Sequence, residues 1–197
     1  MQHSKIVGGS TAKRVIACPG SVALVDTVPP KPSSSYADEG TLLHDSIATI
    51  LERDVDPYRL VGLRYEDVEL TEALVEDKLI PALRALDEID PQGEMEYAVE
   101  SRVGFGDFLP NVFGSTDLLG RLGDRAIVLD WKFGDGVAVE ATENAQLLFY
   151  AAASRRTAET AWAFDGAKEV ELIIVQPPYV KRWVTTLDRV DAFEKEL

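Results

Sequence analysis

The stretch "GSTDLLGRLGDRAIVLDWK", residues 114–132, decides the fold, because two runs of alternating apolar residues flank Gly123-Asp124. A two-residue loop at this point, with glycine first, suits a type II′ turn and joins two antiparallel strands. Such a loop pairs Leu122 with Arg125, and a four-residue loop gives the same register. The stretch therefore predicts a β-hairpin with a defined register.

One face of this hairpin brings two carboxylates together. The register sets Asp117 directly opposite Asp130, with Cβ atoms about 4.5–5.5 Å apart. It also sets Ser115 opposite Lys132. Two carboxylates at this separation repel by roughly 3 kcal/mol at an effective dielectric near 20. A divalent cation between them turns the repulsion into coordination, and oxygen ligands suit Mg²⁺ or Mn²⁺. The alternative is that the aspartates splay apart in water and Lys132 forms an ordinary surface ion pair.

The elements around the hairpin are typical of an α/β or α+β protein. We expect helices over residues 10–25 with a break at Cys18-Pro19-Gly20, 36–53, 71–89 with a kink at Pro81, 143–157 with Thr142 as N-cap, and 188–197. We expect strands over residues 95–103, 112–121, 125–133 and 169–176, and a loop over 26–35. The prediction is one domain over residues 1–197: a mainly helical part over 1–90, then a central mixed β-sheet flanked by helices over 95–176.

Composition narrows the class of protein. The chain of 197 residues carries a net charge of −14, which argues against binding nucleic acid through a broad basic surface. It does not exclude an enzyme that meets a phosphate through a metal ion and a few local cations. No apolar run approaches the roughly 18 residues that span a bilayer, and no apolar signal segment opens the chain. We therefore expect a cytosolic protein that does not contact membranes. The single cysteine, Cys18, excludes a disulfide within the chain, and we expect it to pack as a small apolar group.

Three further side chains are candidates for chemistry. Gln146 and Tyr150 are four residues apart and share one helical face, from which an amide and a phenol could contact a phosphodiester. The alternative is that Tyr150 packs half-buried and Gln146 is solvated. His44 lies in the expected helix 36–53; it is either a satisfied core residue or a nitrogen ligand that completes a metal shell.

Taken together and in order, these motifs resemble the PD-(D/E)XK nuclease superfamily. The residues that carry the resemblance are Gly114-Ser-Thr-Asp117, Asp130-Trp-Lys132 and Gln146-Leu-Leu-Phe-Tyr150. More narrowly, the chain is similar to the RecB-type exonuclease branch, which adds a helical histidine, matched by His44, and a QxxxY helix. The opening "ACPGSVAL…SSSYADEGTLLH" resembles phage- and prophage-encoded members. The resemblance covers about residues 14–176.

The resemblance implies a restriction-endonuclease-like core and a set of roles for these residues. Asp117, Asp130 and His44 would hold Mg²⁺ or Mn²⁺ together with the backbone carbonyl of Trp131, and Lys132 would position the attacking water. Gln146, Tyr150 and Ser115 would contact the substrate, and Glu100 and Glu39 are further candidates. Some relatives hold an iron–sulfur cluster through one cysteine near the Cys18 position and three beyond the QxxxY helix. Those three are missing here, so no cluster is expected.

Two hypotheses about function follow. The first is a metal-dependent deoxyribonuclease, of exonuclease type, that acts on DNA ends or single strands in the cytosol of a bacterial host. The second is a nuclease-fold module without catalysis, which serves as a DNA-end or protein-interaction domain in a phage recombination complex, with a partner protein or as a homo-oligomer. The net charge of −14 favours the second, whereas the intact set of Asp117, Asp130 and Lys132 favours the first. The last helix has no cap, which leaves open that the sequence belongs to a longer protein.

Overall fold

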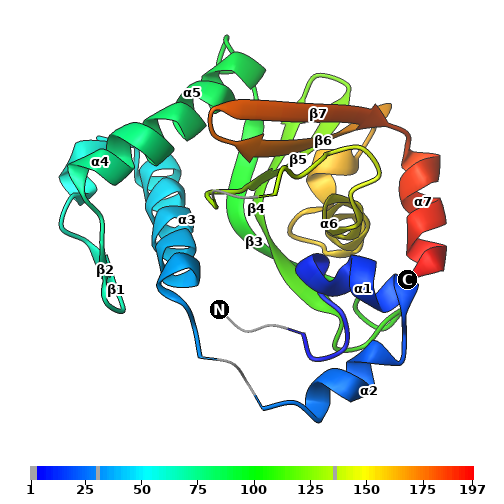
Figure 1. The fold of residues 1–197 in the computed structure, drawn as a ribbon. Coiled ribbons are helices and arrows are strands. Elements are labelled where there is room, and N and C mark those ends of the chain that lie inside the picture. Colours follow the sequence, from blue (N-terminus) through cyan, green and yellow to red (C-terminus); the bar gives the residue numbers. More distant parts are fainter. Residues whose placement is uncertain (1–3, 30–31, 135–136) are drawn as a thin grey trace.

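The centre of the protein is a five-stranded sheet with the strand order β3-β4-β5-β6-β7. A computed structural model describes residues 4–29, 32–134 and 137–197 (Figure 1). The strands are β3 (Glu96–Gly104), β4 (Phe113–Leu122), β5 (Arg125–Trp131), β6 (Glu169–Gln176) and β7 (Tyr179–Thr185). Only the β5–β6 pair is parallel; β3–β4, β4–β5 and β6–β7 are antiparallel. The predicted central mixed sheet flanked by helices is confirmed, although β7 was not expected.

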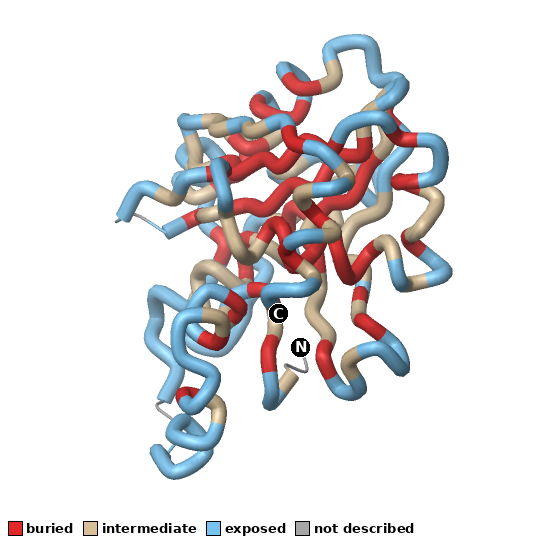
Figure 2. Tube along the Cα trace, turned by 90° about the vertical axis from the view of Figure 1, so that its right-hand side faces the viewer, coloured by how far each residue is buried: buried red, intermediate tan, exposed pale blue. Residues whose placement is uncertain are grey.

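Helices cover both faces of this sheet because its strands are apolar on both sides. On one face, Leu119 and Val128 pack with α6 (Ala145–Arg156), α1 (Ala12–Ala17) and α7 (Leu187–Glu196). On the other, Leu118 and Leu129 pack with α3 (Ser35–Arg53) and α5 (Ile80–Ile89). Figure 2 shows the buried residues gathered along the strands and the helix faces that touch them. The two cores lie on opposite faces of the same strands. Because successive side chains of a strand point to opposite faces, they contact the helices of one core and of the other in turn.

The register predicted for the hairpin is confirmed. Leu122 pairs with Arg125, and Leu118 pairs with Leu129. Gly123 has a φ of 58°, the positive value that the first position of a type II′ turn requires. The register therefore carries Asp117 and Asp130 to the same end of the sheet.

The remaining elements are short or lie at the edges of the fold. They are η1 (Gly9–Thr11), α2 (Ser21–Asp26), η2 (Pro57–Leu60), β1 (Arg64–Tyr65), β2 (Val68–Glu69), α4 (Glu72–Leu74), the π-helical η3 (Val75–Leu79) and η4 (Ala161–Phe164). The break at Cys18-Pro19-Gly20 separates α1 from α2 as predicted. The π-helical turn divides the expected helix 71–89 just before Pro81.

Two local predictions were wrong. The N-cap of α6 is Asn144, whose side chain accepts hydrogen bonds from the backbone N–H groups of Gln146 and Leu147; Thr142 lies too early in the chain for this role. Cys18 is exposed and does not pack as an apolar group, because it ends α1 at the turn to α2. Among the described residues, no helix has the length and apolar character needed to cross a membrane.

Candidate metal centre

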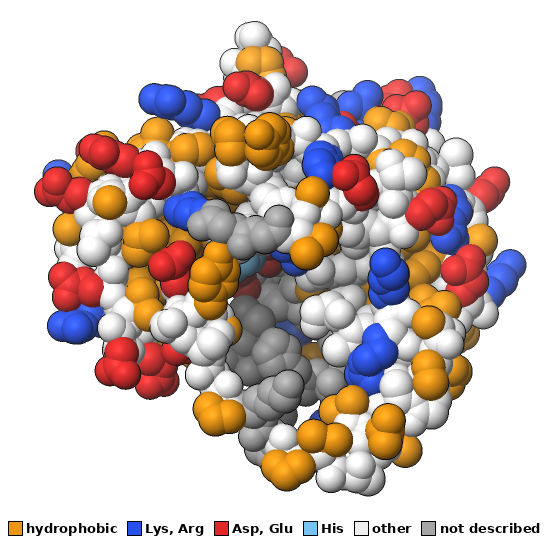
Figure 3. Space-filling view, viewed as in Figure 1, with side chains coloured by type: hydrophobic (Ala, Val, Ile, Leu, Met, Phe, Trp, Pro, Cys, Tyr) orange, Lys and Arg blue, Asp and Glu red, His pale blue; other side chains and the backbone are white. Residues whose placement is uncertain are grey.

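The predicted site residues line a cavity of about 470 Å³ at the end of β4 and β5. Its wall is built from α3, the N-terminal segment around η1, the strands β3 and β4, and the start of α6. Figure 3 shows the molecule hollowed between the α3 side and the α1 side. The cavity forms here because α3 and α6, which cover opposite faces of the sheet, both reach past the strand ends.

The β4–β5 ladder stops where the site begins. Its last backbone pair is Leu118 with Leu129. Past this pair, the backbone N–H of Trp131 donates to the side-chain Oδ2 of Asp117 at 2.7 Å. A carboxylate of β4 therefore accepts this hydrogen bond in place of a backbone carbonyl, and the regular β4–β5 pairing ends. The end of this pairing gives the Asp117 side chain access to the cavity.

A closed network joins the end of β5 to α6. The Nε2 of Gln146 donates to Oδ1 of Asp130 at 2.8 Å and to the hydroxyl oxygen of Tyr150 at 3.2 Å. The Nζ of Lys132 donates to Oε1 of Gln146 at 3.0 Å and lies 2.6 Å from Oδ2 of Asp130. Gln146 therefore holds both Asp130 and Lys132 through its side-chain amide, so the amide is engaged with protein groups rather than with solvent.

Three ligand atoms gather on the other side of the cavity. One atom each from His44, Glu100 and Asp117 lies within 4.8 Å of the other two. The Nδ1 of His44 is 3.4 Å from Oδ2 of Asp117, and the Ser115 hydroxyl donates to Oε2 of Glu100 at 3.1 Å. Glu100 has a φ of 47° in the middle of β3, a conformation that strains any residue except glycine.

Burial makes this group of carboxylates unfavourable without a cation. It raises the pKa of Asp117 well above the usual range, and the neighbouring Asp130 raises it further. Burial also raises the pKa of Glu100, against the hydrogen bond from Ser115 that lowers it. The pKa of His44 is lowered, first by burial, although the nearby Asp130 opposes the shift. A neutral imidazole is the protonation state that binds a metal ion, and a bound cation would favour the ionised carboxylates that burial alone disfavours.

A buried oxygen without a hydrogen bond supports the same conclusion. Asp130 is 1% exposed, and its Oδ2 has no hydrogen-bond partner among the described residues. The nearby ammonium of Lys132 is close enough for an ion pair but lies outside hydrogen-bond geometry. The ion pair compensates the charge of this oxygen but leaves it able to accept a further donor or to coordinate a cation. The donor set of imidazole, carboxylates and this oxygen therefore fits a divalent cation.

The structure brings together most of the side chains predicted from sequence. His44, Ser115, Asp117, Asp130, Lys132, Gln146, Tyr150 and Glu100 all line the cavity. Within the described part of the chain, the cavity lining does not include Glu39, which lies on another face of α3. The side chain of Trp131 is buried in the core, and its backbone hydrogen bond to His44 places its peptide group at the site.

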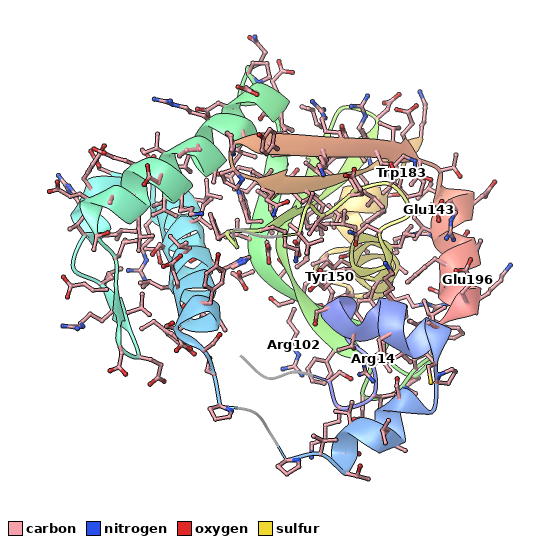
Figure 4. All side chains as sticks on the ribbon, in the orientation of Figure 1. Arg14, Arg102, Glu143, Tyr150, Trp183 and Glu196 are labelled. Carbon is pink, nitrogen blue, oxygen red and sulfur yellow. The ribbon has the colours of Figure 1, made fainter. Side chains whose placement is uncertain are left out.

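Sequence reasoning missed the N-terminal segment. Gly9 packs so closely on Tyr150 that a β-carbon there would lie 2.5 Å from the ring. Figure 4 shows Tyr150 projecting from α6 toward this segment and the cavity. The pair Gly8-Gly9 is the one local signal of such a close approach. Tyr65 of β1 and Asp45 of α3 also line the cavity, and no motif pointed to either.

Comparison with known proteins places the chain in a family. One solved structure, described as "Crystal structure of SSO0001", is similar at 11% sequence identity and a TM-score of 0.28, covering 93% of this chain and 83% of that chain. A score this low supports no inference about this protein. The sequence profile of the family described as "Protein of unknown function (DUF2800)" matches residues 3–195. The chain therefore belongs to the DUF2800 family.

Proposed function

We propose that this protein is a Mg²⁺- or Mn²⁺-dependent deoxyribonuclease, of exonuclease type. The observation that carries the proposal is the meeting of two groups in one cavity: the acidic cluster with His44, and the buried Asp130–Lys132 ion pair. A structural ion pair explains Lys132 but not the desolvated carboxylates beside it. Hydrolysis of a phosphodiester uses both a cation site and a nearby ammonium.

The cation would be held by His44, Glu100, Asp117 and Asp130, with the backbone carbonyl of Trp131 as a further ligand. Carboxylate oxygens suit Mg²⁺ and Mn²⁺, and an imidazole favours Mn²⁺ of the two. When bound, the ion would polarise the phosphate and make a coordinated water a better nucleophile.

The chain's own residues would orient the reaction around that centre. The side chain of Lys132 is 27% exposed and lines the cavity, so its ammonium would hold the attacking water and offset charge that develops on the phosphate. Gln146 keeps Lys132 and Asp130 at fixed positions through its amide. The Ser115 and Tyr150 hydroxyls line the same cavity and would contact the bound strand.

A second candidate is the same fold without catalysis, acting on DNA ends or on a partner protein in a phage recombination complex. The net charge of −14 favours it, because most of the surface would repel nucleic acid. The retention of both facing aspartates together with the lysine argues for catalysis.

A cleavage assay separates the two candidates. Purified protein is incubated with end-labelled single-stranded DNA, duplex DNA and RNA in Mn²⁺, Mg²⁺ or EDTA. We expect cleavage of DNA in the presence of either ion, none in EDTA, and none by Asp117→Asn. Binding of DNA without cleavage by the wild type in any ion would support the non-catalytic module instead.

A further inference from the structure

A stacked pair of side chains lies beside the metal centre and belongs to neither the ligands nor the network around Lys132. The guanidinium of Arg102 lies over the ring of Phe113, 4.3 Å from its centroid. Arg102 pairs with Ser115 across the β3–β4 ladder, and Phe113 pairs with Gly104. Figure 4 shows Arg102 on the stretch of β3 that runs toward α1.

The ladder sets the spacing between this pair and the metal centre. Arg102 follows Glu100 by two residues on β3, and Ser115 precedes Asp117 by two residues on the antiparallel β4. Two residues span about 6.6 Å along a strand at about 3.3 Å per residue. A spacing of this size is short enough for the side chain of Arg102 to reach the backbone of a strand whose scissile phosphate lies at the carboxylates, if that strand runs along β3.

Arg102 is available for such a contact. It is exposed and has no ion-pair partner among the residues that the structure describes, whereas Arg155, Arg156 and Arg189 of α6 and α7 all pair with carboxylates. Stacking on Phe113 uses the face of the guanidinium and leaves its edge donors free for a phosphate. Because the ring already restricts the arginine side chain, less conformational entropy is lost when it binds a phosphate.

A second cavity begins at the same pair. It is lined by Ser101, Arg102, Val103, Gly104, Phe113, Thr157, Glu159 and Thr160. Phe113 lines both this cavity and the cavity of the candidate metal centre, so the two cavities adjoin at this residue. Glu159 is the one acidic side chain among the residues lining this second cavity, and its charge opposes that of a phosphate.

We propose that Arg102, Phe113 and this second cavity form a subsite for the nucleotide next to the scissile phosphate. The guanidinium edge of Arg102 donates to the neighbouring phosphate, and the attached nucleoside occupies the second cavity. The subsite rests on the proposed nuclease function. It gives an acidic protein a local cation where the strand leaves the metal centre, and it makes longer oligonucleotides better substrates than a dinucleotide.

The test measures binding of a labelled single-stranded oligonucleotide in Ca²⁺, with the absence of cleavage checked on the same samples. The variants are Arg102→Ala, Phe113→Leu and Glu159→Gln, with Arg84→Ala as a control, because Arg84 is an exposed arginine on α5. We expect Arg102→Ala to weaken binding roughly tenfold and to lower the salt dependence of log K by about 0.7, the value for one phosphate of a single strand. Phe113→Leu weakens binding less, Glu159→Gln leaves it equal or tighter, and Arg84→Ala leaves it unchanged.

Cleavage in Mn²⁺ separates this subsite from the proposed function. If the wild type cleaves a hexanucleotide faster than a dinucleotide and Arg102→Ala loses that preference, the subsite is supported. If the wild type cleaves and Arg102→Ala matches it in affinity, salt dependence and length preference, the subsite is wrong and the nuclease function stands. If the wild type does not cleave at all, the nuclease function fails and the subsite with it.

Discussion

The ammonium of Lys132 lies 2.6 Å from Oδ2 of Asp130, yet it donates its hydrogen bond to Gln146. The lysine is therefore held between the candidate ligand and Gln146. On the proposed function, Lys132 acts in the chemical step and not in metal binding, and the two roles can be measured independently.

Replacing Lys132 tests that separation. We expect Lys132→Ala to keep or tighten binding of Mn²⁺, because a nearby positive charge is removed. Cleavage falls by about 10²- to 10³-fold, the typical effect of removing one group that stabilises charge in the transition state. Lys132→Arg does not rescue the rate, since its guanidinium is planar and holds its proton. The measurement is a single-turnover cleavage rate at saturating Mn²⁺. If Lys132→Ala cleaves at nearly the wild-type rate, Lys132 has no catalytic role and serves only in the ion pair with Asp130.

The backbone conformation at Glu100 predicts that glycine there is favourable for stability but unfavourable for metal binding. Its φ of 47° is unfavourable for glutamate and allowed for glycine. We expect Glu100→Gly to be more stable than Glu100→Ala by about 1 kcal/mol without metal, while both variants bind Mn²⁺ more weakly than the wild type. Chemical denaturation and Mn²⁺ titration provide the two measurements. The matched control is Glu96, an exposed residue of the same strand, where glycine should be less stable than alanine. Equal stabilities for the two Glu100 variants would show that the backbone there is not strained.

Gly9 predicts a steric effect on Tyr150. A β-carbon at residue 9 would lie 2.5 Å from the tyrosine ring, which is buried and has Gly114 on another side. We expect Gly9→Ala to lower the free energy of unfolding by about 1–3 kcal/mol, as for overpacking in a core. The control is Gly20→Ala, where the added carbon meets nothing within 4 Å. If thermal unfolding of the two variants is the same, the N-terminal segment does not pack on Tyr150 in solution.

Glu171 predicts how stability depends on pH. Burial raises the pKa of its carboxyl. The hydrogen bonds from Arg182 and Arg125, together with their charges, lower it by more than burial raises it, so the pKa lies below its ordinary value of 4.5. A carboxyl whose folded pKa is lowered stabilises the protein above pH 4.5, and this contribution is lost as the pH falls through the folded pKa. We expect Glu171→Gln to cost roughly 1–3 kcal/mol at pH 7.

Urea denaturation at neutral and at acidic pH checks this prediction. The difference between wild type and Glu171→Gln should shrink well below pH 4.5, where the wild-type carboxyl is also neutral. The control is Glu169→Gln, because Glu169 is 52% exposed and faces the same Arg125 at 3.5 Å; exposed pairs of this kind contribute little. A difference that does not change with pH would contradict the assigned role of the carboxylate charge.

Local rules were enough to predict the hairpin and much of the site. The Gly123 turn fixes the register, and the register places Asp117 and Asp130 at one end of the sheet. The four-residue spacing of Gln146 and Tyr150 correctly puts them on one helical face, where they hydrogen-bond to each other. These features depend on residues close together in the sequence, so pattern and turn chemistry suffice.

Other features depend on contacts between distant residues. The strand β7 contains Lys181 and Arg182, whose charges hide its apolar alternation; they pair with Glu140 and Glu171. The place of Glu100 beside His44 and Asp117 in the candidate metal centre coincides with a positive φ that no propensity predicts. The contact of Gly9 with Tyr150 is a second case, because it joins residues that lie far apart in the sequence.

Calorimetric titration of Mn²⁺ into the wild type and Asp117→Asn examines the metal centre itself. Asparagine keeps an oxygen that can accept the hydrogen bond of Trp131 but removes a charge that burial and Asp130 disfavour. We therefore expect Asp117→Asn to unfold at the same temperature as the metal-free wild type or higher. We also expect it to lose the heat of Mn²⁺ binding that the wild type gives. Binding of Mn²⁺ by Asp117→Asn as tight as that of the wild type would contradict a metal centre at this cavity.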